Sequence, residues 1–220
     1  RQNRFTGWAD PPLTAAGRKE AVAAGQRLAA AGFRFDVAYS SRLQRARATG
    51  HLVLGASGNH DIALHHDWRL NERHYGALQG LNKARMVEQV GEDQVWRWRR
   101  AYAERPPLMA ANDPYHPVHQ PQWQDIPAAE LPNGENLAQT RERVGAFWDG
   151  TIVPAMETGN RILIASHGNT LRALLMKLDA MSIADVESFE IPTGVPILYR
   201  FDGQGRSLGW GYLVDAGDAA

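Results

Sequence analysis

One stretch, Arg161 to Leu175, restricts the fold of this chain more than any other. Its first half is short, apolar and rich in branched residues, which is typical of a fully buried strand. Its second half has the spacing of an amphipathic helix, with leucines at 171, 174, 175 and 178. The turn between them, Ser166–Asn169, is therefore expected at the carboxyl end of a parallel strand, where open sheets bind ligands. The free N–H groups at the start of the following helix favour an anion there.

The rest of the chain is predicted to alternate between helices and strands. We predict helices at 14–31, 42–54, 82–90, 92–104, 135–150 and 182–190, and strands at 37–39, 61–66, 195–201 and 210–214. At 220 residues and 44% hydrophobic composition, the chain can form one sizeable domain with a packed core. The alternation predicts an α/β fold: a three-layer sandwich with a mostly parallel central sheet, helices on both faces and a final hairpin.

Several local signals refine this prediction. Thr14 is expected to cap the first helix, whose buried stripe is predicted at 21, 24, 25 and 28, and Ser40–Ser41 is expected to cap the second. Pro154 is expected to end or kink the helix that begins near 135. The proline-rich segment 106–132 has little periodicity and is predicted to be a functional lid or a disordered excursion.

The charge balance excludes some classes of partner. Lys+Arg and Asp+Glu total 24 each, which argues against bulk attraction to nucleic acid or to an anionic membrane. The absence of cysteine excludes disulfides and thiol chemistry. Because the sequence has neither a secretory segment nor an apolar run long enough to span a bilayer, we expect a cytoplasmic protein.

Two helix starts carry groups suited to binding anions. His167 next to Gly168 is either a structural cap or part of an anion site. Arg42, Arg45 and Arg47 crowd the start of the predicted second helix, where the helix dipole disfavours cations. Either these arginines form a solvated face, or a bound anion removes the conflict, because a guanidinium grips a phosphate with two parallel hydrogen bonds.

Two further segments combine several charged groups. Trp96–Arg100 interleaves basic and aromatic residues, which fits single-stranded nucleic acid, an exposed helix face, or an arginine pair that grips a small polyanion. The balanced charge weakens the nucleic-acid interpretation. Leu70–Gly80 places Glu72 among many hydrogen-bond donors, where it can act as a general acid and base or stabilise the loop through an ion pair.

The sequence gives little support for metal or nucleotide sites. Side chains of His65–Asp67 would point to alternate faces of a strand, and His116 and His119 lie without obvious further ligands. The sequence contains no Walker loop, no G-x-G-x-x-G and no G-x-S-x-G.

Taken together, these segments resemble the cofactor-dependent phosphoglycerate mutases of the histidine phosphatase superfamily. The resemblance runs from Arg4 to Tyr212. Its most specific part is the segment 70–83, because small phosphatases of the superfamily share the His-Gly turn but not this loop. The segments that carry the resemblance are Asn3–Trp8, Ser41–Ala46, Leu70–Lys83, Trp98–Arg100, Ala165–Asn169 and Ile191–Pro196.

The resemblance implies a glycolytic and gluconeogenic isomerase that interconverts 3- and 2-phosphoglycerate through a phosphohistidine. It implies 2,3-bisphosphoglycerate as priming cofactor, no metal, small phosphoglycerates as the only ligands, and a homodimer or homotetramer. Glu72 would take and return the substrate's hydroxyl proton, while Arg45 and His167 stabilise the transferring phosphoryl group. The residues expected to bind substrate are Thr6, Gly7, Arg45, Glu72, Arg73, His74, Tyr75, Lys83, Arg99, Arg100, Gly168 and Asn169.

The sequence departs from the family pattern at its start. The family's nucleophile lies in an Arg-His-Gly-Glu motif upstream of the Phe-Thr-Gly-Trp segment, which is found here at 5–8. We therefore expect a single mutase-like domain, residues 1–220, that is N-terminally incomplete and lacks the central first strand. His167 belongs to the second His-Gly motif and is not the phosphorylated residue. The alternatives are a bisphosphoglycerate or general histidine phosphatase, and an inactive polyanion binder if the chain truly starts at Arg1.

Overall fold

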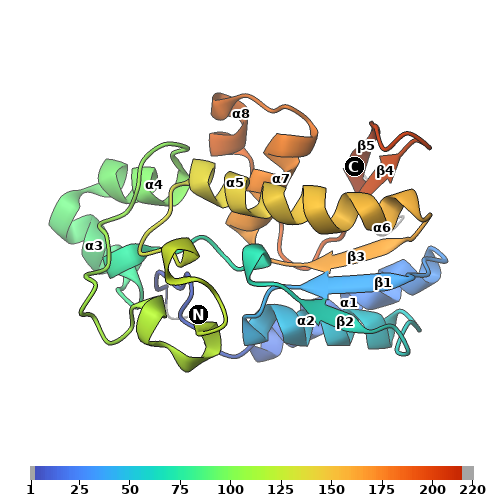
Figure 1. Cartoon of the computed structure of the whole chain (residues 1–220), viewed down its shortest axis with the longest axis horizontal. Helices are drawn as coiled ribbons and strands as arrows, with labels where there is room; N and C mark the ends of the chain where they lie inside the picture. Colours follow the sequence, from blue (N-terminus) through green and yellow to red (C-terminus); the bar gives the residue numbers. More distant parts are fainter. Residues whose placement is uncertain (1–2, 215–220) are drawn as a thin grey trace.

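The computed structural model of the chain describes residues 3–214 and has the predicted α/β layers. A parallel sheet of β1 (Val37–Ser40), β2 (Leu64–His66) and β3 (Ile162–Ala165) runs in the order β2-β1-β3. In Figure 1, α1 (Ala15–Ala30) and α2 (Gln44–Ala56) lie on one side of the sheet. On the other side lie α5 (Leu137–Phe147), α6 (Val153–Glu157) and α7 (Gly168–Leu178). The predicted fold class is confirmed.

The remaining elements flank these layers. The pair α3 (Lys83–Val90) and α4 (Glu92–Arg100) extends to one end of the molecule. The short helix α8 (Ile183–Ser188) contacts α7. The strands β4 (Ile197–Phe201) and β5 (Ser207–Tyr212) form the predicted antiparallel hairpin as a separate sheet. No helix within residues 3–214 is long and apolar enough to cross a membrane.

The first helix follows its sequence signals closely. Thr14 accepts a hydrogen bond from the backbone of Gly17, and the predicted stripe at 21, 24, 25 and 28 is buried. Gly25 allows a close approach to α2, because a Cβ there would lie 2.7 Å from the carbonyl oxygen of Val53. This apolar contact covers one face of β1, whose Ala38 is fully buried.

The second helix begins differently from the prediction. Its N-cap residue is Leu43, with no side-chain cap, so the expected cap at Ser40–Ser41 is wrong. The hydroxyl of Ser41 accepts from the N–H of Leu43, which precedes the helix, and is also bonded to Nε2 of His167, 126 residues away. The hydroxyl therefore combines a local backbone bond with a tertiary contact and does not cap the helix.

The strand β3 is less buried than predicted. Only Ala165 of β3 is buried, and the other three residues are half-buried. β3 pairs with β1 on one edge, and within residues 3–214 no strand pairs with its other edge. The expected further strand beside β3 remains a prediction.

Three other boundaries also differ. Of the predicted strand 61–66 only residues 64–66 form β2, and α4 stops at Arg100 instead of 104. The helix expected at 135–150 continues through a π-helical turn, Trp148–Ile152, into α6. Pro154 does not end the helical run, and it lies in the first turn of α6, directly after the π-helical turn.

The segment 106–132 is ordered without long elements. It contains three short 3₁₀ turns, Pro117–His119, Pro121–Trp123 and Ala128–Glu130. Trp123 and Ile126 are buried in a cluster with Trp8 and Leu43, so a disordered excursion is excluded. Its role as a lid remains a prediction.

Candidate active site

The first part of the site lies where two parallel strands end together. Ser40 of β1 is in register with Ala165 of β3, so Ser41 and His167 emerge side by side. The hydroxyl of Ser41 and Nε2 of His167 are 2.7 Å apart. Burial lowers the pKa of His167 well below its ordinary value, and the charges of Arg45 and Arg143 act in the same direction. The ring is therefore neutral at pH 7 and faces a positively charged surrounding.

The start of α7 provides a surface that a ligand can approach. His167 is its N-cap residue and makes no side-chain cap bond, which leaves the first N–H groups of the helix to other partners. Gly168 is exposed, and a Cβ built on it would meet nothing within 4 Å. The predicted strand, turn and helix around 166–169 are present, and an anion site there remains a prediction.

Arg45, in the first turn of α2, contacts the N-terminal segment. Its two terminal nitrogens donate to the carbonyl oxygens of Gly7 and Ala9, at 2.8 and 3.0 Å. Burial lowers its pKa, whereas the nearby charges of Glu72 and Asp10 raise it. Arg42 instead forms a two-bond ion pair with Asp125 of the 106–132 segment. Of the crowded arginines, Arg45 alone is within electrostatic range of both His167 and Glu72.

The loop that carries Glu72 is fixed from behind by a buried ion pair. Glu135 and Arg143 are joined by two hydrogen bonds of 2.8 and 2.9 Å, and their side chains are 6% and 7% exposed. Arg143 also donates to the carbonyl oxygens of Arg69 and Asn71, and Glu135 accepts from the backbone N–H of His74. The pair therefore holds the loop on both sides of Glu72.

Polar groups just after β3 and on α7 hold the same loop from the sheet side. Ser166 donates to the carbonyl oxygen of Leu70, and Thr170 donates to that of Asn71. The carboxylate of Glu72 accepts from the N–H of Arg73 at 2.9 Å, and its carbonyl oxygen accepts from the indole of Trp8. These bonds bring the loop to the end of the sheet where His167 lies.

Gly7 packs closely against the loop that carries Glu72. Gly7 has φ +50°, and a Cβ there would lie 2.5 Å from the side-chain oxygen of Gln79 and 3.0 Å from the backbone nitrogen of Tyr75. That oxygen of Gln79 accepts from the N–H of Trp8. Only glycine combines this backbone conformation with so close an approach.

A second group of cations lies beyond Glu72. Burial lowers the pKa of Lys83, and the charges of Arg99 and Arg100 lower it as well, so these three residues share one region. The charge of Glu72 also acts on Lys83. Arg100 forms an ion pair with Glu190, whose side chain is 73% exposed. The structure thus brings together the predicted residues of helices α3 and α4.

Two predicted substrate-binding residues lie deeper than the others. Arg73 and His74 are fully buried. Nδ1 of His74 accepts from the N–H of Gly76, and the ring contacts Trp8 edge-on. Burial lowers the pKa of His74 to about 3, which keeps it neutral. Arg73 lies over the ring of Tyr75 and donates to its hydroxyl and to the carbonyl oxygen of Trp98. These contacts stabilise the loop itself.

Sequence reasoning missed five residues that build the site. Glu135 and Arg143 are eight residues apart, and only the fold shows that they contact the Glu72 loop. Gln79 lies inside the segment 70–83, but the sequence predicts no role for it. The missed residues are Ser41, Gln79, Glu135, Arg143 and Arg172.

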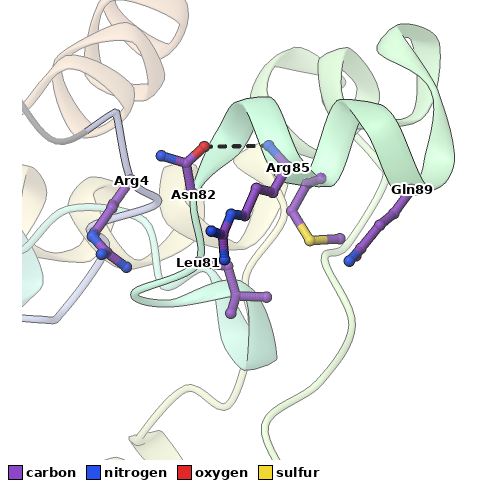
Figure 2. Close-up of a pocket in the computed structure, with 6 residues that line it drawn as sticks. Arg4, Leu81, Asn82, Arg85 and Gln89 are labelled. Atoms are coloured by element: carbon purple, nitrogen blue, oxygen red, sulfur yellow. Dashed lines mark hydrogen bonds between the residues drawn. The ribbon is translucent and has the colours of Figure 1, made fainter.

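A separate hollow of about 370 Å³ lies outside this site, against the first turns of α3. Figure 2 shows Arg4 and Arg85 on its walls, with Leu81 and Gln89 beside them. The predicted catalytic residues are not among those that line it. Within residues 3–214, no group of three or more histidine, aspartate or glutamate side chains is arranged to hold a metal ion.

Residues 1–116 and 108–211 match the sequence profile of the Histidine phosphatase superfamily (branch 1). The chain therefore belongs to the histidine phosphatase superfamily, as the sequence motifs implied. Within it, the chain is 46% identical over 218 residues to the 2,3-bisphosphoglycerate-dependent phosphoglycerate mutase of Nitratidesulfovibrio vulgaris. That match covers 99% of this chain and 87% of the relative.

Solved structures show the same fold at lower identity. A mycobacterial glucosyl-3-phosphoglycerate phosphatase matches with a TM-score of 0.67 at 20% identity, covering 96% of this chain and 90% of its own. A phosphoglycerate mutase from Bacillus anthracis matches with a TM-score of 0.59 at 24% identity, covering 81% and 73%. At such low identities, the similarity to these structures supports the fold alone. The reaction has to be inferred from the residues of the site.

Proposed function

We propose that the protein interconverts 3-phosphoglycerate and 2-phosphoglycerate through a phosphohistidine enzyme primed by 2,3-bisphosphoglycerate. One observation carries the proposal: the charge of Glu72 acts on two groups of cations. It acts on Arg45, and it also acts on Lys83 and Arg172. A ligand with two anionic ends fits such a site with its hydroxyl near the carboxylate. The mutase name of the 46% identical relative supports this assignment.

The first cation group suits the transferring phosphoryl group. Phosphoryl transfer asks a protein mainly to position the reactants and to compensate charge on the equatorial oxygens. Arg45, the neutral ring of His167 and the N–H groups around Gly168 and Asn169 supply donors for those oxygens. Glu72 takes the proton of the attacking hydroxyl and returns it in the reverse step.

The second cation group suits the other anionic end of the ligand. Lys83, Arg99 and Arg100 supply charge, and Tyr75 and Asn169 supply donors. Arg73 also fits this polyanion, because its buried Nε and Nη1 have no hydrogen-bond partner among the described residues. Thr6 and Gly7 line the substrate side, and His74 supports the loop. 2,3-Bisphosphoglycerate supplies the priming phosphoryl group when it is bound.

His167 is proposed to assist the transfer and not to accept the phosphoryl group. It is 8% exposed, and its Nε2 is paired with Ser41. The accepting histidine is proposed to be another residue, the one that the family carries in its Arg-His-Gly-Glu motif. The absence of a metal from the reaction, a cytoplasmic location and a homodimer or homotetramer also remain predictions.

Incubation of the full-length protein with 3-phosphoglycerate tests the function, with and without 2,3-bisphosphoglycerate, by ³¹P NMR of the products. We expect an equilibrium mixture of the 3- and 2-isomers whose formation depends on the bisphosphate. Release of inorganic phosphate without isomer exchange would instead identify a phosphatase. Binding without either reaction would identify an inactive polyanion binder.

A further inference from the structure

Arg172, on α7, contacts the site through another residue. It is 3% exposed, and Nε donates to the carbonyl oxygen of Val186 in α8 at 3.1 Å. Its Nη1 donates to the side-chain oxygen of Asn169 at 3.1 Å. Burial and the charges of Arg100 and Arg73 lower the pKa of Arg172 to about 10, so it stays protonated at neutral pH. It therefore acts as a donor throughout the physiological range.

This contact determines which way the amide of Asn169 points. A guanidinium can only donate hydrogen bonds, so the amide oxygen of Asn169 must face Arg172. Its amide nitrogen then faces the hydroxyl of Tyr75, 3.3 Å away. The reversed amide would place two donors against each other at Arg172 and remove the donor at Tyr75.

The fixed amide of Asn169 in turn determines the hydrogen-bonding role of Tyr75. Its hydroxyl oxygen also accepts from Nη2 of Arg73 at 3.2 Å. Donors from Asn169 and Arg73 occupy both acceptor positions of the hydroxyl, so its own hydrogen remains to be donated elsewhere. Arg73 is fully buried, and its Nε and Nη1 have no partner among the described residues. This wall of the site therefore presents donors.

We propose that Arg172 is a positioning residue that fixes Asn169 and Tyr75 as donors, so that this wall selects a ligand by its ionised carboxylate or phosphate oxygens. An ionised oxygen accepts these bonds as strong charge-assisted ones, whereas a ligand hydroxyl accepts them more weakly and an ammonium group can only donate. The inference deepens the proposed function, on which it rests for the identity of the ligand.

The test measures binding of 3-phosphoglycerate to the full chain by calorimetry. Arg172→Lys keeps the charge, but a single ammonium cannot hold both Val186 and Asn169 in the geometry of the guanidinium fork. We expect the affinity to fall about fivefold to tenfold, the worth of one hydrogen bond of this kind. In a Tyr75→Phe background the same substitution should change the affinity by less than twofold. Lys177→Gln, which removes another α7 cation, should leave the affinity unchanged.

Two results would overturn the inference. One is a change of less than twofold for Arg172→Lys in the parent protein. The other is an undiminished loss in the Tyr75→Phe background, which would show that Arg172 acts on the ligand without Tyr75. Isomer exchange is not part of this measurement, so a protein that binds without exchanging leaves the inference intact and refutes only the mutase function.

A second double-mutant cycle tests the inference if the Arg172→Lys variant does not fold. It combines Tyr75→Phe with Asn169→Ala and leaves Arg172 bonded to α8. The inference expects Tyr75→Phe to lower the affinity about fivefold to tenfold in the parent protein. In the Asn169→Ala protein the effect should be less than twofold, because the direction of the hydroxyl is no longer fixed. Equal effects in both proteins would overturn the inference.

Discussion

Removal of Arg143 should destabilise the protein strongly, because it leaves a buried carboxylate without its partner. The side chain of Glu135 is 6% exposed and takes two hydrogen bonds from Arg143. Breaking a buried pair from one side typically costs about 3–5 kcal/mol. We expect Arg143→Met to lower the free energy of unfolding by about that amount.

Removing both charges should cost less, because no unpaired charge then remains buried. In the double variant Arg143→Met/Glu135→Gln, a side-chain oxygen can still accept from the N–H of His74. The carbonyl oxygen of Asn71 keeps its bond from Thr170, while that of Arg69 loses its bond from Arg143. One unsatisfied backbone group corresponds to about 1–3 kcal/mol.

Urea unfolding followed by circular dichroism measures these differences. The matched control is Arg161→Met, which breaks the exposed pair with Asp36 and should have a much smaller effect. A loss below about 1 kcal/mol for the single variant would refute the reasoning, since it would place Glu135 in contact with water. A double variant no more stable than the single one would refute it as well.

Three other predictions concern the site. Glu72→Gln should lower turnover by about 10²–10⁴-fold, because the hydroxyl proton loses its acceptor, and near-normal turnover in a steady-state assay would exclude the proton-transfer role. Glu190→Gln should lower KM for 3-phosphoglycerate about twofold to fivefold by freeing Arg100 for the ligand, whereas a raised KM would show that Glu190 orients Arg100 for binding. Because the pKa of His74 is lowered from 6.5 to about 3, the unfolded chain takes up a proton below pH 6.5 that the folded protein does not. Stability should therefore fall with pH from about 6.5 downward, by up to about 1.4 kcal/mol per pH unit for this histidine, and urea unfolding should show a shallower fall in His74→Asn.

Features set by short-range patterns were predictable from the sequence. The cap at Thr14 and the stripe of α1 depend on residues within a few turns of one another, and both are confirmed. The turn at His167 was placed correctly because a branched apolar run followed by leucines at helical spacing allows few other structures. The family was predictable because the segments that carry it are long and specific.

Features set by long-range contacts were not predictable. The hydroxyl of Ser41 has the local chemistry of a cap, and its contact with His167 depends on the parallel pairing of β1 with β3. Arg42 has the same composition signal as Arg45, yet its charge is matched by Asp125, 83 residues away. The direction of Asn169 depends on Arg172, whose burial against Val186 is a contact with another helix.

The most direct test of the mutase account follows the phosphoryl group itself. Full-length protein is incubated with ³²P-labelled 2,3-bisphosphoglycerate, and unlabelled 3-phosphoglycerate is then added. We expect acid-labile label on a histidine other than His167, followed by its transfer to phosphoglycerate. Absence of labelled protein, label on His167, or release of all the label as inorganic phosphate would contradict the account.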